Sequence, residues 1–109
     1  MNMFRIALAN IRFPATPDES IMLAEKAIAR ASVERAGLIC FPECFIPGYR
    51  IGKLVPPSEV RFLEGAWSAV ASAAARANIT VILGTERFVD GALRLTALVI
   101  NADGSIAGF

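Results

Sequence analysis

The chain has 109 residues, of which 55% are hydrophobic and 19% charged, so it holds at most one hydrophobic core and is not intrinsically disordered. Its 11 basic and 10 acidic residues leave a net charge of +1, which gives no electrostatic basis for binding nucleic acid or an anionic membrane. Histidine is absent, which excludes Ser-His-Asp and Cys-His catalytic sites and every metal site built on imidazole.

The first predicted elements are a strand and a helix. The short apolar segment Phe4–Ile11 predicts the strand. The helix is expected to follow, because Thr16 fits its N-cap, Pro17 its first position and Glu19 the third position of a capping box. Gly37 is expected to end it as the C′ residue. The apolar residues at helical spacing are Ile21, Ala24, Ile28 and Ala31.

A buried strand, a loop and a second helix are predicted in the middle of the chain. Leu38–Phe41 is an apolar run that fits a strand buried on both faces. The proline- and glycine-rich stretch Glu43–Ser58 predicts a loop, and Ser58 can cap a helix over Glu59–Ala77. Trp67 lies on the apolar face of this helix, so we expect it in the core and not in a ligand platform.

The last part of the chain is predicted to be a run of strands joined by turns. Asp90-Gly91 is a strong signal for a two-residue hairpin, and Asp103-Gly104 marks another turn. The strands are expected at Ile79–Gly84 with its continuation Arg87–Val89, at Leu93–Ile100 and at Ser105–Phe109.

This order of elements predicts a mixed sheet with one uncovered face. A strand–helix–strand unit makes the first strands parallel, and the hairpin adds an antiparallel pair. Most of the strands are apolar on both faces, but two helices can cover only one face of a sheet. We therefore expect either a homo-oligomer or a piece of a larger fold.

Glu43 is the residue that most suggests chemistry. It comes directly after the predicted strand Leu38–Phe41, and functional groups of open α/β sheets gather at the carboxyl ends of strands. Partial burial would make its carboxylate a usable general base near neutral pH. The alternative is a carboxylate that caps the loop or pairs with Arg50.

The sequence around Glu43 closely resembles the first signature of the nitrilase, or carbon–nitrogen hydrolase, superfamily. Residues 38–49 read L-I-C-F-P-E-C-F-I-P-G-Y, which is an apolar strand, then Phe-Pro-Glu, then an apolar loop ending in Gly-Tyr. Val81–Glu86 (V-I-L-G-T-E) resembles the third strand of the family, and Asn101–Gly108 resembles its Asp-Gly turn and following strand. The resemblance covers the whole chain.

The resemblance implies an α/β fold, namely the N-terminal half of an α-β-β-α sandwich, with one mixed sheet and two helices on one face. Residues 1–109 would then be a single partial domain. The family uses a Glu-Lys-Cys site that hydrolyses a non-peptide amide, nitrile or carbamoyl compound without a cofactor. By its motif Glu43 is the general base, and Tyr49 is a candidate substrate-binding residue, with simple packing in the loop as the alternative. The lysine and cysteine are expected beyond Phe109, so this chain alone is expected to be inactive.

Neither cysteine is expected to replace the missing nucleophile. Cys44 adjoins Glu43, but neighbouring side chains of an extended segment point apart, so we interpret Cys44 as a small apolar loop residue. Cys40 is expected to be buried in its strand and inert. A disulfide between them would need a sharp bend at Pro42.

Two lysines are expected in solvent, and one further glutamate has two possible roles. Lys26 is expected on the solvated face of the first helix, and Lys53 is expected to be a solvated loop lysine. Glu86 ends a predicted strand near the expected site, where it either orients a neighbour by hydrogen bonding or pairs with Arg87 or Arg94.

The sequence also bears on where the protein is located and on an alternative to an enzyme. No apolar run reaches the ~20 residues that a membrane helix needs, and Arg5 and Arg12 interrupt the N-terminal apolar stretch, unlike a secretory signal. We therefore expect a cytoplasmic protein. The alternative to an enzyme is a non-catalytic binding or assembly module built on half of the sandwich. The sequence beyond Phe109 would discriminate between the two.

Overall fold

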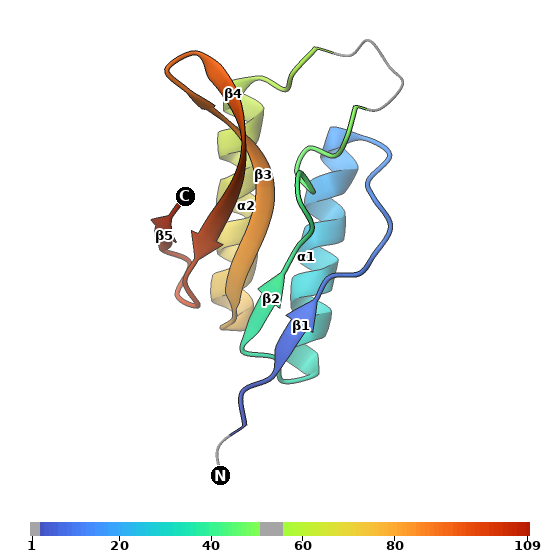
Figure 1. Ribbon diagram of the computed structural model, residues 1–109. Helices are drawn as coiled ribbons and strands as arrows, with labels where there is room; N and C mark the ends of the chain where they lie inside the picture. The colour runs from blue at the N-terminus through green and yellow to red at the C-terminus, as the bar shows by residue number, and fades with distance from the viewer. Residues whose placement is uncertain (1–2, 51–55) are drawn as a thin grey trace.

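A mixed five-stranded sheet forms one layer of the protein, and two helices form the other (Figure 1). The computed structural model describes residues 3–50 and 56–109. The strands lie in the order β1-β2-β3-β4-β5; the first three are parallel and the last three antiparallel, as predicted. The elements are β1 (Ile6–Leu8), α1 (Pro17–Val33), β2 (Leu38–Cys40), α2 (Val60–Ala77), β3 (Thr80–Val89), β4 (Ala92–Ile100) and β5 (Ile106–Gly108).

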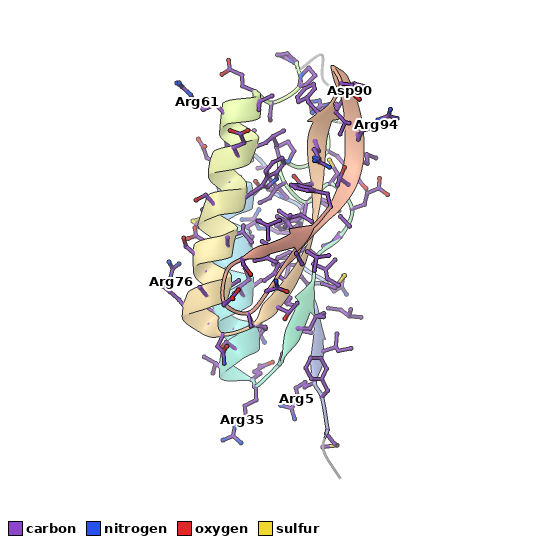
Figure 2. The ribbon with its side chains drawn as sticks, turned by 90° about the vertical axis from the view of Figure 1, so that its left-hand side faces the viewer. Arg5, Arg35, Arg61, Arg76, Asp90 and Arg94 are labelled. Atoms are coloured by element: carbon purple, nitrogen blue, oxygen red, sulfur yellow. The ribbon has the colours of Figure 1, made fainter. Side chains whose placement is uncertain are left out.

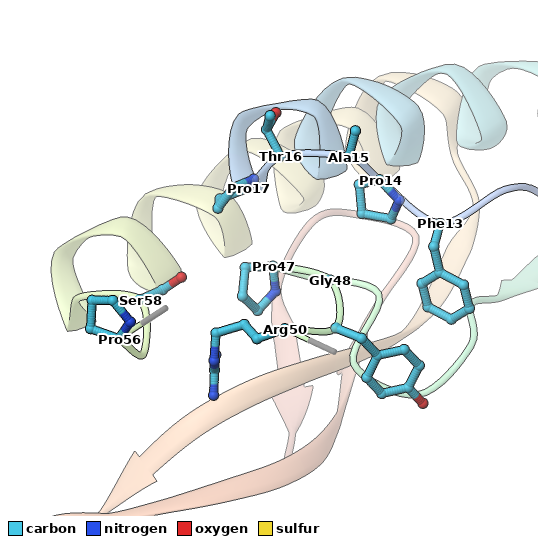
Figure 3. A pocket seen from close by; sticks show the side chains of 11 residues that line it. Phe13, Pro14, Ala15, Thr16, Pro17, Pro47, Gly48, Arg50, Pro56 and Ser58 are labelled. Carbon is cyan, nitrogen blue, oxygen red and sulfur yellow. The ribbon is translucent and has the colours of Figure 1, made fainter. Parts of the chain in front are cut away.

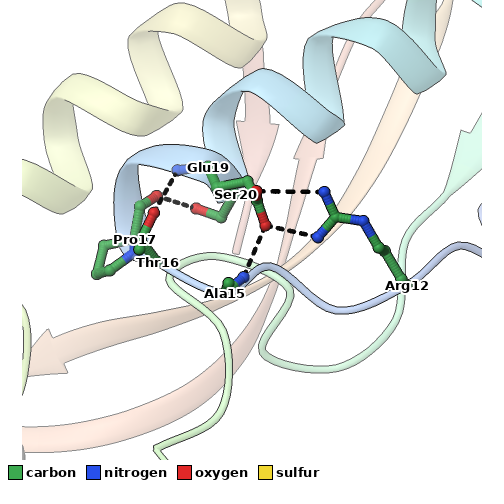
Figure 4. Close-up of polar contacts among 6 residues, drawn as sticks. All are labelled: Arg12, Ala15, Thr16, Pro17, Glu19 and Ser20. Carbon is green, nitrogen blue, oxygen red and sulfur yellow. Dashed lines mark hydrogen bonds and ion pairs between the residues drawn. The ribbon is translucent and has the colours of Figure 1, made fainter.

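The predicted capping box begins α1 (Figure 4). The backbone N–H of Glu19 donates to Oγ1 of Thr16 over 3.1 Å, and the N–H of Ala15 donates to Oε1 of Glu19 over 2.7 Å. Arg12 adds an ion pair to the same carboxylate, with Nη1 and Oε1 2.7 Å apart. The bond to Thr16 satisfies an N–H group that the first turn of a helix leaves without a partner, and the Glu19 carboxylate accepts from Ala15, the residue before the N-cap, where a capping box would use Thr16 itself.

The end of α1 differs from the prediction. The left-handed residue after the helix is Arg35, with φ of 62°, and not Gly37. The chain therefore leaves the helix earlier, and Gly37 begins the approach to β2 by donating its N–H to the carbonyl of Arg5. A Cβ atom at position 37 would lie 2.4 Å from the ring of Phe4, an exposed side chain that would have to turn aside.

The caps of α2 also correct one prediction. Glu59, and not Ser58, is the N-cap residue, and its side chain makes no capping hydrogen bond. At the other end Asn78 adopts the left-handed conformation with φ of 52°, and its N–H donates to the carbonyl of Ala75. A short polar side chain tolerates this conformation, so Asn78 takes the place that glycine often has.

The helices pack on one face of the sheet and form the core there. Residues of β3 and β4 that point toward the helices are fully buried, and so are the facing residues of α1 and α2. Trp67 is partly buried against this core, as expected, and its indole N–H donates to Oγ1 of Thr85 over 2.9 Å. The largest members of the core are Phe45, Ile28, Ile39, Ile46, Leu63, Ile79, Leu83, Leu98, Ile100, Val70 and Val81.

The opposite face of the sheet has no helix over it among the described residues (Figure 2). Ile6 and Leu8 of β1 are 58% and 76% exposed, and Leu95 of β4 is 59% exposed. Cys40 pairs in register with Leu8, so it shares this face and is only partly buried, which corrects the expectation of a buried strand cysteine. The apolar uncovered face that the strand pattern predicted is therefore present.

The hairpin forms as predicted, but β1 is shorter than expected. Asp90 and Gly91 have φ of 51° and 78°, which are the positive values that a two-residue turn of this kind needs. The predicted strand Ile79–Gly84 and its continuation Arg87–Val89 form one strand, β3. The predicted strand Phe4–Ile11 is reduced to the three residues that face β2, because β2 itself is that short.

Candidate active site

Glu43 lies just beyond the carboxyl end of β2, as the sequence predicted. The N–H of Phe41 donates to the carbonyl of Ile82 over 2.9 Å, so the pairing with β3 continues one residue past β2 before Pro42 ends it. The side chain of Glu43 is exposed, which corrects the expected partial burial. Its carboxylate is therefore directly accessible to a molecule that approaches this edge of the sheet.

The loop that follows Glu43 is attached to β3 by backbone hydrogen bonds. The N–H of Ile46 donates to the carbonyl of Gly84, and the N–H of Glu86 donates to the carbonyl of Ile46, each over 3.1 Å. Phe45 and Ile46 are fully buried in the core. The backbone on either side of the exposed carboxylate is therefore fixed by the sheet and by packing.

Gly84 allows β3 to approach the Glu43 segment closely. A Cβ atom at position 84 would lie 2.0 Å from the carbonyl oxygen of Pro42 and 2.8 Å from Cα of Glu43. Both are backbone atoms, so they cannot turn aside as a flexible side chain could. Any residue other than glycine at this position would displace the candidate catalytic residue.

Glu86 forms a buried ion pair with Arg50. Its side chain is 2% exposed, and Oε1 accepts a hydrogen bond from Nη1 of Arg50. Of the two alternatives for Glu86, the surface pair with Arg87 or Arg94 is therefore wrong, and the alternative that Arg50 pairs with Glu43 is wrong as well. Among the described residues no group donates to Oε2 of Glu86, although this oxygen is buried.

Cys44 lies beside this ion pair and is not poised to be a nucleophile. It is buried, and burial, followed by the negative charge of Glu86, raises the pKa of its thiol to about 11. The residue has φ of 53°, so the segment is sharply turned and not extended as the sequence argument assumed. A thiol with this pKa is protonated near neutral pH, whereas the thiolate is the reactive form. Cys40 and Cys44 are both free thiols.

Tyr49 lies on the wall of a cavity of about 490 Å³. Figure 3 shows this cavity with its labelled lining residues, among them Phe13, Pro47 and Arg50. The ring centroid of Tyr49 lies 4.9 Å from that of Phe13 with the rings tilted by 39°, and Tyr49 is 45% exposed. Loss of hydration, and next the negative charge of Glu43, raise the pKa of Tyr49, so the two side chains are electrostatic neighbours. The cavity is lined by Phe13, Pro14, Ala15, Thr16, Pro17, Pro47, Gly48, Tyr49, Arg50, Pro56 and Ser58.

The lysines do not join this arrangement in the described part of the chain. Lys26 is exposed on α1, as predicted, and Lys53 lies outside the described residues. Residues 3–50 and 56–109 contain no group of three or more His, Cys, Asp or Glu side chains that could hold a metal ion. In the same residues neither helix has the length and apolarity needed to cross a membrane.

Two features of the site were missed by sequence reasoning. The close approach at Gly84 had a usable signal, because a glycine inside a strand often marks a place where another backbone comes near. The pair of Arg50 and Glu86 had none, since the partners are 36 positions apart and equally plausible partners lie closer in the sequence.

Comparison with known proteins places the chain in a family. A family model described as carbon–nitrogen hydrolase matches residues 5–109. Among curated proteins, an arylacetonitrilase of Aspergillus niger is 26% identical over an alignment 118 positions long with its gaps, which covers 91% of this chain and 36% of that protein.

Two solved structures share the fold. An amidase from Nesterenkonia sp. superposes with a TM-score of 0.80 at 24% identity and covers 96% of this chain and 41% of its own. A carbon–nitrogen hydrolase from Helicobacter pylori G27 superposes with a TM-score of 0.81 at 17% identity. The superposition covers 98% of this chain and 38% of that hydrolase. The chain therefore spans less than half the length of these relatives. Because the family model matches it from residue 5 to residue 109, the chain belongs to the carbon–nitrogen hydrolase family.

Proposed function

We propose that the protein to which this chain belongs hydrolyses a non-peptide carbon–nitrogen bond, with Glu43 as its general base. The observation that carries the proposal is the exposed carboxylate of Glu43 at the end of β2, on a backbone fixed by β3. The relatives support the substrate class. One is an arylacetonitrilase, and the amidase from Nesterenkonia has been crystallised with acrylamide and with acrylamide added to its active-site cysteine.

The chemistry divides among three side chains. Glu43 accepts the proton of a cysteine thiol, and the resulting thiolate attacks the carbon of an amide, nitrile or carbamoyl group. A lysine ammonium stabilises the negative charge that develops in the tetrahedral intermediate. Glu43 is the member of this set that the 109-residue chain contains, and the proposal assigns the lysine and the cysteine to sequence beyond Phe109. The mechanism needs no cofactor.

The first experiment replaces Glu43 by glutamine in the complete protein. We expect kcat/KM for a short aliphatic amide to fall by about 10²-fold or more, because a general base is removed while the shape of the side chain is kept. Glu64→Gln is the matched control, since Glu64 is exposed on α2 away from β2. A folded Glu43→Gln protein with normal turnover would contradict the assignment.

The 109-residue chain alone is proposed to be inactive. Cys44 has a pKa of about 11, so it offers little thiolate near neutral pH. Ammonia release from amides, nitriles and carbamoyl amino acids measures this directly. Activity that disappears in Cys44→Ala would show that Cys44 is a nucleophile after all.

A second candidate function is a non-catalytic binding or assembly module. The uncovered apolar face of the sheet, with exposed Ile6, Leu8 and Leu95, favours it, because such a face needs a partner. The reading frame discriminates between the two functions. A frame that continues past Phe109 with a lysine and then a cysteine after a strand supports the hydrolase, and a stop codon after Phe109 supports the module.

A further inference from the structure

We propose that Glu86 is a positioning residue for the hydrolase: through its buried ion pair with Arg50 it holds the loop that presents Glu43. The inference rests on the proposed function, since it concerns how the base of that site is kept in place. Glu86 does not touch the substrate in this proposal. It acts through Arg50, and so through the backbone of residues 43–50.

The first step is the burial of the carboxylate. The side chain of Glu86 is 2% exposed and that of Arg50 is 28% exposed. A buried charge is tolerated when an opposite charge and hydrogen bonds compensate the loss of water. Arg50 is the group that compensates Glu86 among the described residues, and Oε2 has no partner there. Removing Arg50 would therefore leave this buried charge without a compensating group among the described residues.

The second step is that Arg50 belongs to the same loop as Glu43. Glu43 and Arg50 stand at the two ends of one loop. The first end rests on Gly84, the middle is bonded at Ile46, and the far end is held by the side chain of Glu86. Gly84 and Glu86 of β3 thus contact the loop at both ends and in the middle, and Glu86 supplies the ion pair at the far end.

The third step is that Glu86 is itself fixed. The indole N–H of Trp67 in α2 donates to Oγ1 of Thr85, and the Thr85 hydroxyl donates to the backbone carbonyl of Glu86 over 3.0 Å. The N–H of Glu86 donates to Ile46 on the other side. Strand, helix and loop therefore meet at this residue, and its carboxylate is directed at Arg50 from a rigid backbone.

The fourth step is the proximity of the pair to the base. Cys44 follows Glu43 directly. Burial and the charge of Glu86 raise the pKa of the Cys44 thiol and the charge of Arg50 lowers it, so the pair lies close to this residue. A change in the pair therefore acts within one residue of the proposed base. Misplacing a catalytic group by about 1 Å can reduce a rate by about 10²-fold, so loosening this loop should lower kcat more than it weakens substrate binding.

The test uses the complete protein and four variants. Glu86→Gln and Arg50→Gln each remove one charge, and the double variant removes both, so it leaves no unpaired buried charge. Glu64→Gln is the matched control on the exposed face of α2. The measurements are kcat and KM for a short amide, the pH profile of kcat, and amide hydrogen exchange at Ile46 and Gly48. The N–H of Ile46 donates to Gly84 of β3, and that of Gly48 donates to Cys44 within the loop.

We expect all three pair variants to lose kcat by about 10-fold or more while KM changes by less than about threefold, and the acidic limb of the kcat profile to move. Exchange at Ile46 and Gly48 should become faster, with Glu64→Gln unchanged in every measurement. If the single variants do not fold, the double variant carries the test. A folded double variant with normal kcat, pH profile and exchange would overturn the inference.

Failure of the proposed function would look different. Glu43→Gln is assayed in parallel, and full activity in that variant removes Glu43 as the base. The exchange rates at Ile46 and Gly48 still report whether Glu86 holds the loop, because they do not depend on turnover.

Discussion

Glu19 and Glu86 are both paired with arginines, but the two pairs differ in their exposure to water. Arg12 and Glu19 are 61% and 23% exposed in the first pair, whereas Arg50 and Glu86 are 28% and 2% exposed in the second. Water screens an exposed pair and leaves it little net energy, whereas removing one partner of a buried pair is strongly destabilising, by about 3–5 kcal/mol. The capping pair therefore tunes the start of α1, and the buried pair decides where a loop lies.

The carboxyl group of Glu19 should titrate far below an ordinary glutamate. Hydrogen bonds from Arg12 and from the N–H of Ala15 hold the pKa of Glu19 at about 2. Because the folded-state pKa is depressed, the stability that this group contributes is present above its ordinary pKa of about 4.3 and is lost as the pH falls toward 2. NMR titration of the side-chain carbon measures the pKa.

The control for Glu19 is Arg12→Gln. This variant removes the bond that lowers the pKa most but keeps the bond from Ala15, so the pKa of Glu19 should rise part of the way toward its ordinary value. Unchanged titration of Glu19 in Arg12→Gln would mean that the ion pair does not form in solution.

At the scale of elements, local signals in the sequence predicted well what local interactions decide. The N-terminus of α1 was predictable because Thr16 and Glu19 bond within one turn, and the hairpin because Asp90 and Gly91 adopt positive φ. The prediction that Gly37 ends α1 was wrong because a glycine after a helix can either adopt a left-handed conformation or leave space for a neighbour. Here Gly37 lies next to the ring of Phe4. The length of β1 was not predictable, since its pairing depends on how short β2 is.

Two glycine substitutions should have opposite effects on stability. At Gly84 an alanine Cβ would lie 2.0 Å from the Pro42 carbonyl, so β3 and the Glu43 segment must separate, at a cost of about 2 kcal/mol or more. At Gly65, inside α2, a Cβ meets nothing within 4 Å, so alanine should stabilise the helix by about 1 kcal/mol. Urea unfolding of Gly84→Ala and Gly65→Ala measures both.

Each glycine variant controls for the other, because the chemical change is the same. A Gly84→Ala protein as stable as the wild type would show that β3 can move away from Pro42 freely. The close approach at Gly84 would then not fix the position of Glu43.

At the scale of the whole molecule, the sequence predicted the position of the Glu43 carboxylate but not the ion pair of Arg50 with Glu86 near it. Glu43 was predictable because a strand end is visible in the order of apolar residues and prolines. The pair of Arg50 with Glu86 arises from tertiary contact between a loop and a strand, and nothing in the spacing of charges distinguishes it from Arg87 or Arg94. Accessibility was misjudged for a similar reason. The exposure of Glu43 depends on which elements cover the sheet edge, and the two helices lie elsewhere.

The uncovered face of the sheet should make the 109-residue chain associate with itself. Phe4, Ile6 and Leu8 project from one face of the first strand region, and Leu95 extends the apolar surface on β4. Soluble monomers rarely expose an apolar patch above about 300–600 Å², and burial is worth about 25 cal/mol per Å², so packing sheet on sheet is strongly favoured. Light scattering at micromolar concentration should therefore give a dimer, a higher oligomer or an aggregate.

Paired charge substitutions test whether this face is the cause. Leu8→Glu places a carboxylate on the uncovered face and should shift the chain toward monomer, because association would then bury an unpaired charge. Met22→Glu is the control, since Met22 is exposed on α1 and lies away from this face, so it should leave association unchanged. If the unsubstituted chain is a monodisperse, folded monomer that binds no hydrophobic dye, the sheet face does not drive association. Equal association in the two variants would instead point to another surface.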